Sequence, residues 1–392
     1  MKHIESIISS IKKLKSSPLK SGEWVETWKQ EAQASFWRRK GSLLATPGET
    51  AETPRIQDGD LVRRIMVAYR QAVSSDTNLG NSMWNTFSQT YLQDIHKTFL
   101  GTDVEAAIAI LRNPAKGNLF YGFDNLILLD TENFKQRKRQ ELNAANCMDG
   151  LARFAEAFGI IPLENMEAYG SEEPTPLQAD ELIDKITKAT RWNFTVPNPF
   201  PNEHGLRTSR GIVSYRTPQA LYQAWKMKQL MRDIDQPRIL EIGGGLGRTA
   251  YYSFELGMRN YSIVDIPTTL IAQAYFLGRT LGEDKILLYG ESQLESQPQI
   301  KLLPPQSFLA GPEKYDLIAN IDSLTEFDKT VAAAYWDQIR VSAPLFWSVN
   351  HEQNTFRVRD IIDGANGLVD SDRNLYWMRR GYVEELVRFK LN

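Results

Sequence analysis

The second half of this 392-residue chain alternates short apolar runs with amphipathic patterns, and this alternation constrains the fold most strongly. The order of residues predicts strands at 238–242, 261–266, 285–289, 315–320 and 345–350. Helices are expected between them at 249–256, 267–282 and 330–342. Strands that alternate with helices pair in parallel, because each helix carries the chain back across the sheet. The sequence therefore predicts an α/β fold in three layers.

The last residues follow a different pattern. Val387, Phe389 and Leu391 alternate with basic residues, as in a strand with one solvent-exposed face. Together with residues 375–378 this strand predicts a closing antiparallel hairpin. The expected sheet is therefore mostly parallel, with an antiparallel C-terminal strand.

The first half shows helical periodicity and none of the short alternating runs of a sheet. Helices are expected at 22–39, 60–73, 102–111, 143–158 and 180–189, the third behind a capping box at 102–105. We therefore expect a helical domain over 1–205 and an α/β domain over 206–392. The helical domain would serve as a lid, a substrate cover or the contact of a homodimer.

Three prolines mark the transition between the halves. Pro197, Pro199 and Pro201 exclude a helix and predict a long loop over 191–211. Thr217-Pro218 supplies a cap and a first-turn proline for a helix that runs to about residue 231.

Composition excludes several classes of partner. Lys and Arg number 46 against 48 Asp and Glu, so no basic excess indicates binding to nucleic acid or to an acidic membrane. The single cysteine, Cys147, cannot form an internal disulfide, which favours a reducing compartment. No run reaches the roughly 20 apolar residues of a membrane span. Residues 1–17 carry isoleucines at helical spacing among lysines instead of the apolar core of a secretory signal. We expect a cytoplasmic protein.

The first expected strand of the α/β half runs into a glycine-rich turn, Gly243-Gly244-Gly245-Leu246-Gly247. Glycine at such a turn permits positive φ and lets a ligand approach the backbone closely. Arg248 stands where a dinucleotide fingerprint requires its third glycine, so that pattern fails. Glu241 precedes the turn, and its carboxylate would attract a cationic ligand and repel a pyrophosphate.

A second acid follows the next expected strand. Asp265 lies 22 residues beyond Gly243, a spacing that suits a carboxylate accepting hydrogen bonds from two ribose hydroxyls. Ile266, beside it, is expected at the same site. The alternative role for Asp265 is to cap the helix that Pro267 opens.

Polar residues also end the strand at 315–320. Asn320, Asp322, Ser323 and Glu326 would lie next to the first strand, in the crevice where ligands bind to open α/β sheets. The Asn/Asp-Pro-Pro-aromatic motif of nucleobase methyltransferases is absent here, because the only Pro-Pro pair nearby, 304–305, precedes Gln306. A nucleobase substrate is therefore disfavoured.

These segments resemble those of a known family. Glu241 with Gly243, Gly245 and Gly247 resembles motif I of class I S-adenosylmethionine (SAM)-dependent methyltransferases. The wider pattern is similar to the sugar O-methyltransferase family, at 113–123, 206–216, 239–245, 263–267, 320–326, 347–352 and 377–385. The resemblance covers most of the chain beyond about residue 100. It implies a Rossmann-like sheet, SAM as cofactor, and contacts to it from Glu241, Gly243, Gly244, Gly245, Gly247, Asp265, Ile266 and Asn320.

Transfer of a methyl group to a hydroxyl requires a base for the hydroxyl proton. His351, after the fifth strand, is our preferred base, although a surface or capping histidine is the equal alternative. The family often has a bulkier or basic residue at this position, so no role is carried over to His351 from the resemblance. Asp322 and Glu326 are its rivals, four residues apart and on one face if a helix begins there. They could accept the proton, ligate a divalent ion or bind sugar hydroxyls, and no dedicated metal site is predicted.

A basic cluster accompanies the proline loop. His204, Arg207, Arg210 and Arg216 could bind a phosphate or carboxylate of the acceptor, and the alternative is that they pin the loop to the sheet. Glu291, after the third strand, could approach an adenine amine or be a solvated loop acid.

The leading hypothesis is a SAM-dependent O-methyltransferase acting on a sugar hydroxyl of a glycan, nucleotide sugar or glycosylated metabolite. A second reading keeps SAM and changes the acceptor to a phenol or amine. A third is a catalytically silent scaffold, against which the intact Glu241, Gly243, Gly245 and Asp265 argue. A nicotinamide enzyme is the remaining alternative.

Overall fold

A computed structural model describes residues 38–51, 57–75, 83–114, 117–122, 134–165, 177–292 and 299–390 of the chain. The chain divides at Lys40, and the residues from Gly41 onward form one compact unit. The domain boundary at residue 205 stays a prediction. Most of the helix expected at 22–39 lies outside the described residues. None of the described helices is both long and apolar enough to cross a membrane.

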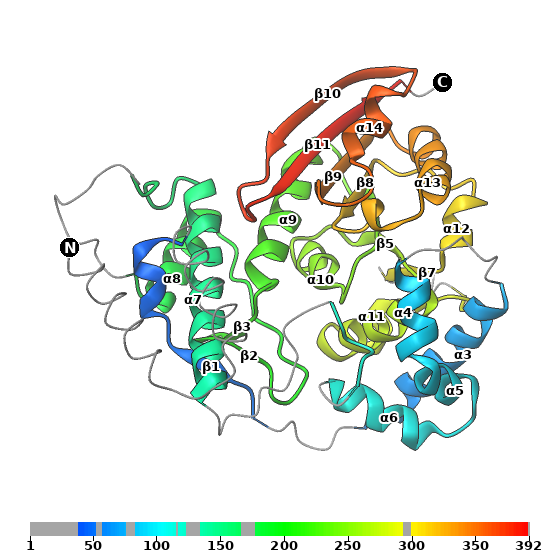
Figure 1. Ribbon diagram of the computed structural model, residues 1–392, viewed down its shortest axis with the longest axis horizontal. Coiled ribbons are helices and arrows are strands. Elements are labelled where there is room, and N and C mark those ends of the chain that lie inside the picture. The colour runs from blue at the N-terminus through cyan, green and yellow to red at the C-terminus, as the bar shows by residue number, and fades with distance from the viewer. Residues whose placement is uncertain are drawn as a thin grey trace, which may run out of the picture. The chain divides into compact units, whose positions relative to one another are not determined.

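An eight-stranded sheet forms the centre of this unit, in the order β10–β11–β9–β8–β4–β5–β7–β6. Its strands are β4 (Arg238–Ile242), β5 (Asn260–Val264), β6 (Ile286–Leu288), β7 (Ile300–Leu303), β8 (Leu317–Ile321), β9 (Leu345–His351), β10 (Leu368–Leu375) and β11 (Tyr382–Phe389). All pairs from β6 to β9 are parallel, and β11 is inserted antiparallel between β9 and β10 (Figure 1). The predicted α/β sheet, mostly parallel with an antiparallel C-terminal strand, is confirmed.

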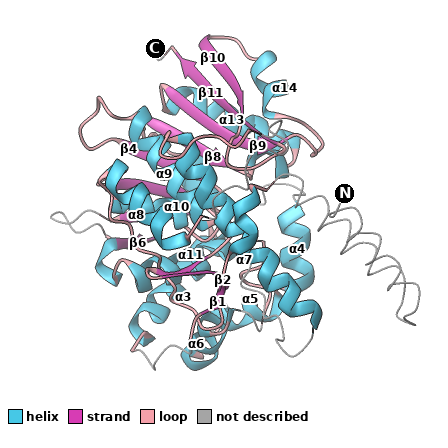
Figure 2. Cartoon of the chain, turned by 90° about the vertical axis from the view of Figure 1, so that its left-hand side faces the viewer, coloured by secondary structure: helices cyan, strands magenta, loops and turns pink. Residues whose placement is uncertain are grey.

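Helices cover both faces of the sheet, as Figure 2 shows. They are α9 (Thr217–Leu230), α10 (Arg248–Glu255), α11 (Pro267–Thr280), α12 (Pro305–Leu309), α13 (Lys329–Ser342) and α14 (Val358–Asp363). Because side chains alternate along a strand, β4 sends Ile239 into one apolar core and Leu240 with Ile242 into the other. Trp347 and Phe346 of β9 divide in the same way, so the sheet is buried on both faces.

One strand of this half, β7, and two of its helices, α12 and α14, were not expected from the sequence. β7 has only four residues, too few for periodicity to indicate a strand, yet it separates β6 from β5. Pro304 and Pro305 follow it as the cap and first residue of α12. The strand expected at 285–289 is therefore the edge strand β6.

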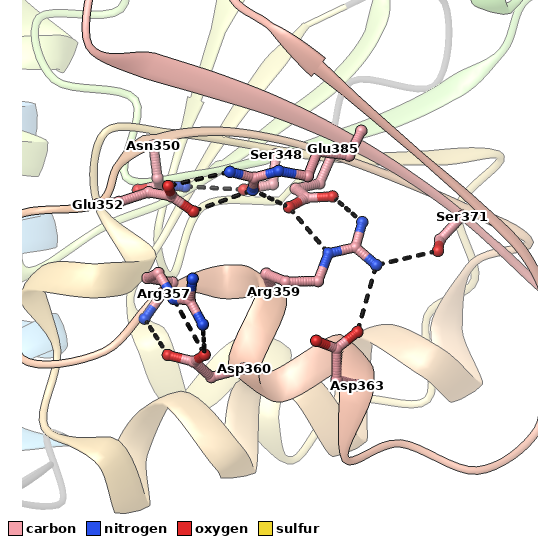
Figure 3. A network of polar contacts seen from close by, with 10 residues as sticks. Ser348, Asn350, Glu352, Arg357, Arg359, Asp360, Asp363, Ser371 and Glu385 are labelled. Atoms are coloured by element: carbon pink, nitrogen blue, oxygen red, sulfur yellow. Dashed lines mark hydrogen bonds and ion pairs between the residues drawn. The ribbon is translucent and has the colours of Figure 1, made fainter.

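The C-terminal hairpin also differs from its prediction. Its first strand is β10, at 368–375, and not 375–378, because a polar edge strand with Asp370 and Asp372 lacks apolar alternation. A buried carboxylate, Glu385 of β11, ties the hairpin to α14 (Figure 3). It accepts hydrogen bonds from Arg359 of α14 and, at 2.8 Å, from Arg373 of β10.

Six described α-helices precede α9 in the chain. They are α3 (Gly59–Ser74), α4 (Met83–Tyr91), α5 (Gln93–Leu100), α6 (Val104–Arg112), α7 (Phe134–Ala157) and α8 (Ala179–Thr190). α3 packs on α11 and α7 packs on α9, so the helical half shares an apolar core with one face of the sheet. The cap of α6 is Asp103, whose Oδ1 accepts from Ala106 N at 3.0 Å, and not Thr102 as the capping box suggested.

A small antiparallel sheet corrects the prediction that the first half has no strands. It consists of β1 (Pro47–Glu49), β2 (His204–Thr208) and β3 (Gly211–Val213) in that order. β2 lies inside the region expected to be a loop over 191–211. β1 has only three residues, and its partner β2 lies more than 150 residues further along the chain. Local periodicity therefore cannot indicate this strand.

Candidate functional site

A cavity opens at the carboxyl ends of β4, β5 and β8. β4 lies between the other two strands, so the chain leaves it toward β5 and later returns to β8 on its other side. This reversal of strand order creates the crevice in which open α/β sheets bind ligands. The predicted residues that line the cavity are Arg216, Glu241, Gly243, Gly244, Gly245, Asp265, Ile266, Asp322 and Glu326.

The glycine turn after β4 requires its glycines for several reasons. Gly243 and Gly245 have φ of 75° and 55°, which favour glycine. A Cβ on Gly243 would lie 2.1 Å from the Ser323 hydroxyl, whereas a Cβ on Gly245 would meet nothing within 4 Å. Gly245 therefore faces open space, while Gly243 allows β4 and the end of β8 to approach. Gly247 caps α10 with φ of 88° and does not line the cavity.

Two acids line the cavity wall, Glu241 buried and Asp265 half-buried. Burial raises the pKa of Glu241 to about 7, although a hydrogen bond from Tyr261 at 2.9 Å opposes the shift. Burial likewise raises the pKa of Asp265 to about 7, against hydrogen bonds from Ile266 N and Gln273. No Lys, Arg or His of the described residues forms an ion pair with either acid. A ligand that supplies positive charge or hydroxyl donors would relieve this burial.

Gln273 of α11 was not foreseen from the sequence. Its Nε2 donates to Asp265 Oδ2 at 2.7 Å and to the Gly245 carbonyl at 2.9 Å. It thereby fixes the acid and the turn relative to each other. Its place in the middle of a buried helix gives no sequence signal for this role.

Asn320 is placed differently from its prediction as a cofactor contact. Its side chain is fully buried and does not line the cavity. It donates to Ile242 O at 3.0 Å and accepts from Asn350 Nδ2 at 2.8 Å. Asn320 therefore holds the ends of β4, β8 and β9 together under the site.

Asp322 projects from the end of β8 with a positive φ of 58°. Its Oδ2 accepts from Arg379 at 2.8 Å and from the Tyr382 hydroxyl at 3.0 Å, and Arg216 lies at 3.6 Å. With so many donors on one oxygen, Asp322 is suited to orient neighbouring groups more than to accept a proton.

Glu326 ends the short 3₁₀ turn η4 (Leu324–Glu326), so the helix expected to place it on one face with Asp322 does not form. Both residues nevertheless line the cavity. Burial raises the pKa of Glu326 to about 7, opposed by a hydrogen bond from Trp84 and reinforced by the charge of Asp322. A carboxylate that titrates near neutral pH is well matched to general-base catalysis.

His351, the base preferred from the sequence, does not line the cavity. Its Nδ1 accepts from Gln353 N at 3.2 Å, and its Nε2 lies 4.0 Å from Asp322 Oδ1. The imidazole therefore lies outside the cavity, next to Asp322. Among the three candidate catalytic residues, Glu326 has the best placement for a base.

The basic cluster around the proline loop does not assemble at the cavity. Only Arg216 lines it. His204 is buried near Gln140, and burial lowers its pKa. Arg210 donates to Phe194 O and to Thr187, and Arg207 is exposed on β2. Arg210 therefore joins the proline loop to α8.

Glu291 also serves the scaffold. Its carboxylate receives two hydrogen bonds from Arg64 of α3, at 2.8 and 2.9 Å, and does not line the cavity. Burial raises its pKa, but the Arg64 contacts outweigh this and leave the pKa below the usual value. Glu291 therefore joins the helical half to the end of β6.

Several residues of the cavity wall carry no signal in the sequence, Arg248 and Trp84 among them. Arg248 forms a buried ion pair with Glu203 at 3.2 Å and so ties the proline loop to the glycine turn. Trp84 comes from α4 and reaches Glu326 across the cavity. Each reaches the site through a contact distant in sequence. Within the described residues, no group of three His, Cys, Asp or Glu side chains could hold a metal ion.

No protein-family model matches this chain. A search of curated proteins likewise found no match. Among solved structures, the glycopeptide N-methyltransferase MtfA is 11% identical with a TM-score of 0.34, over 44% of this chain and 90% of its own. Magnesium protoporphyrin IX methyltransferase (ChlM) from Synechocystis PCC 6803 is 14% identical with a TM-score of 0.30, over 44% of this chain and 83% of its own.

At these identities and TM-scores the two structures carry no argument about ligand or activity. The assignment of the fold rests on the strand order of this chain. A mostly parallel sheet with helices on both faces, and with β11 antiparallel between β9 and β10, is a Rossmann-like α/β fold.

Proposed function

We propose that this protein is a SAM-dependent methyltransferase that transfers a methyl group to a hydroxyl of a sugar or glycosylated metabolite. The main support for this proposal is that one cavity holds two different sets of side chains. Glu241, Asp265 and the glycine turn lie at the ends of β4 and β5, and Asp322 and Glu326 lie at the end of β8. The first set suits a cationic, hydroxyl-bearing cofactor and the second suits the acceptor.

The chemistry of SAM fits the first set. SAM bears a sulfonium, an ammonium group and two ribose hydroxyls. Glu241 is buried and Asp265 half-buried, and neither acid has a cationic partner among the described residues. Gly245, with open space where a Cβ would stand, allows the ligand to approach the backbone. A pyrophosphate cofactor would add negative charge to these acids, which disfavours a nicotinamide enzyme.

The charge of the cavity favours a neutral acceptor. Its lining carries two arginines, Arg216 and Arg248, against four acids, and Arg248 is already paired with Glu203. An anionic acceptor would therefore meet a wall that carries more carboxyl groups than arginines. A neutral sugar could donate its hydroxyls to Asp322 and Glu326 and lay its C–H face on an aromatic ring.

The reaction is an in-line displacement. When bound, SAM supplies an electrophilic methyl group on a positively charged sulfur. Transfer of that methyl group would form a C–O bond to the acceptor oxygen and break the C–S bond, whose electron pair would stay on sulfur. Glu326 takes the hydroxyl proton onto its carboxylate, and Asp322 orients the acceptor. The walls of the cavity hold the reactants in line, which lowers the entropic part of the barrier.

The test is methyl transfer from labelled SAM to a panel of neutral methyl glycosides, with glucuronic acid and an aromatic amine as comparisons. We expect label in a neutral glycoside. Label in the amine alone would support the second candidate, an N-methyltransferase, which the net acidic wall would also suit. Absence of label in every acceptor would favour a silent scaffold.

A further inference from the structure

A tryptophan from the helical half reaches the proposed base. Trp84 lies at the start of α4, and its indole Nε1 donates to Glu326 Oε2 at 2.5 Å. The two residues are 242 positions apart in the sequence. It is the one hydrogen bond to the Glu326 carboxylate from the described residues. Because Glu326 ends a single 3₁₀ turn, its own backbone gives the carboxylate little support.

The indole is held from a second segment. Gly122 has a φ of 83°, and a Cβ built there would lie 3.0 Å from Trp84 Cη2. The Trp84 ring meets Phe87 edge-on at 5.7 Å, and Phe87 stacks on Tyr121 at 5.0 Å. Residues of α4 and of the segment before 122 therefore fix the plane of the indole, and with it the direction of its N–H.

We propose that Trp84 is a positioning residue for methyl transfer: its indole N–H holds Oε2 of Glu326 and so directs the carboxylate toward the acceptor hydroxyl. This inference rests on the proposed function. The choice of donor has a physical reason. An arginine or lysine would hold the carboxylate more firmly, but its charge would weaken the carboxylate as a base. A neutral indole has a single N–H, so it fixes one oxygen of the Glu326 carboxylate and leaves most of the basicity of that carboxylate in place.

The charged groups that face Glu326 come from three other elements. Asp322, at the end of β8, raises the pKa of Glu326, and Arg216 and Arg379 lower it. The Trp84 hydrogen bond also lowers that pKa. Loss of the indole N–H should therefore move the titration of Glu326 to higher pH while the other charges stay in place.

The contact can be tested without an acceptor. The chain has nine tryptophans, so ¹⁵N-tryptophan labelling of the whole protein gives few indole signals. The Trp84 signal is identified by its loss in Trp84→Phe. We expect its indole proton to titrate with a midpoint near pH 7, the pKa of Glu326, and to stop titrating in Glu326→Gln. An indole signal that is constant from pH 5 to pH 9, or that still titrates in Glu326→Gln, would overturn the proposal.

The catalytic consequence is measured with SAM and the best neutral methyl glycoside. We expect Trp84→Phe to lower kcat about tenfold at pH 7, the effect of losing one hydrogen bond to a charged group, with SAM affinity unchanged. The acid limb of its kcat profile should move to higher pH, so that much of the loss is recovered at pH 9. Trp377→Phe, which removes an indole N–H bonded to Arg153 O on a half-exposed ring, is the matched control and should leave the profile unchanged.

The outcomes separate the two proposals. An equal loss of kcat at all pH values, or a loss of SAM affinity in Trp84→Phe, would show a structural role and overturn the inference. Wild-type protein that does not bind SAM would overturn the proposed function, and the indole titration would still decide whether Trp84 holds Glu326.

Discussion

At the scale of single residues, the site combines side chains that the sequence could indicate with others that it could not. Glu241 lies near the end of β4, and Asp265 and Asp322 follow directly after β5 and β8. The carboxyl ends of neighbouring parallel strands meet at one edge of the sheet. Their convergence was therefore predictable. Trp84 and Gln273 sit within helices, and only tertiary packing brings them to Glu326 and Asp265.

Glu241 should lower the stability of the ligand-free protein while it strengthens the binding of SAM. Because its pKa is raised to about 7, the folded protein binds a proton that the unfolded chain releases near pH 4.5, and stability falls as pH rises between these values. Glu241→Gln should therefore stabilise the ligand-free protein by roughly 2 kcal/mol at pH 8 and by little at pH 5, while it weakens SAM binding. Chemical denaturation at both pH values measures this.

A surface acid supplies the control for that measurement. Glu255→Gln changes an exposed residue at the end of α10 and should alter stability by less than about 0.5 kcal/mol at either pH. Destabilisation by Glu241→Gln at pH 8 would mean that the buried carboxylate serves the fold.

At the scale of elements, prediction succeeded where local pattern and burial agree. The buried strand β4 was placed at its observed bounds, because apolar runs between a polar start and a glycine turn are distinctive. β1, β7 and β10 were missed or misplaced, since three- and four-residue strands and a polar edge strand carry no periodicity. Pairing partners far along the chain determine these strands.

The C-terminal hairpin should depend on its buried carboxylate. Glu385→Ala leaves Arg359 and Arg373 without their shared partner and should destabilise the protein by about 1–3 kcal/mol. Asp370→Ala removes an exposed ion pair with Arg388 on the same hairpin and should cost under about 1 kcal/mol. Equal effects of the two variants in urea denaturation would contradict the importance of burial.

At the scale of the whole molecule, the helical half and the sheet share one core. α3 packs on α11, α7 packs on α9, and β1 pairs with β2. The wall of the cavity likewise takes Trp84 and Gly122 from the helical half. The helices before the sheet therefore contribute both to its stability and to its site.

This sharing predicts the behaviour of truncated chains. A fragment of residues 206–392 would expose the apolar surface that α11 buries against α3, and we expect it to be aggregated or to lack cooperative thermal unfolding. A fragment of residues 41–392 should unfold in one cooperative transition. Cooperative unfolding of the shorter fragment, followed by circular dichroism, would instead support an independent domain beginning near residue 206.

The cavity at the ends of β4 and β5 is proposed to bind SAM through Asp265 and Glu241. Isothermal titration calorimetry of the full chain with S-adenosylhomocysteine and SAM at pH 8 tests it most directly. We predict one site per chain, at least tenfold weaker in Asp265→Asn, because the neutral amide cannot accept two hydroxyl hydrogen bonds as the carboxylate does. Absence of binding by the wild-type protein, or the same affinity in Asp265→Asn, would mean that this cavity does not bind SAM through Asp265.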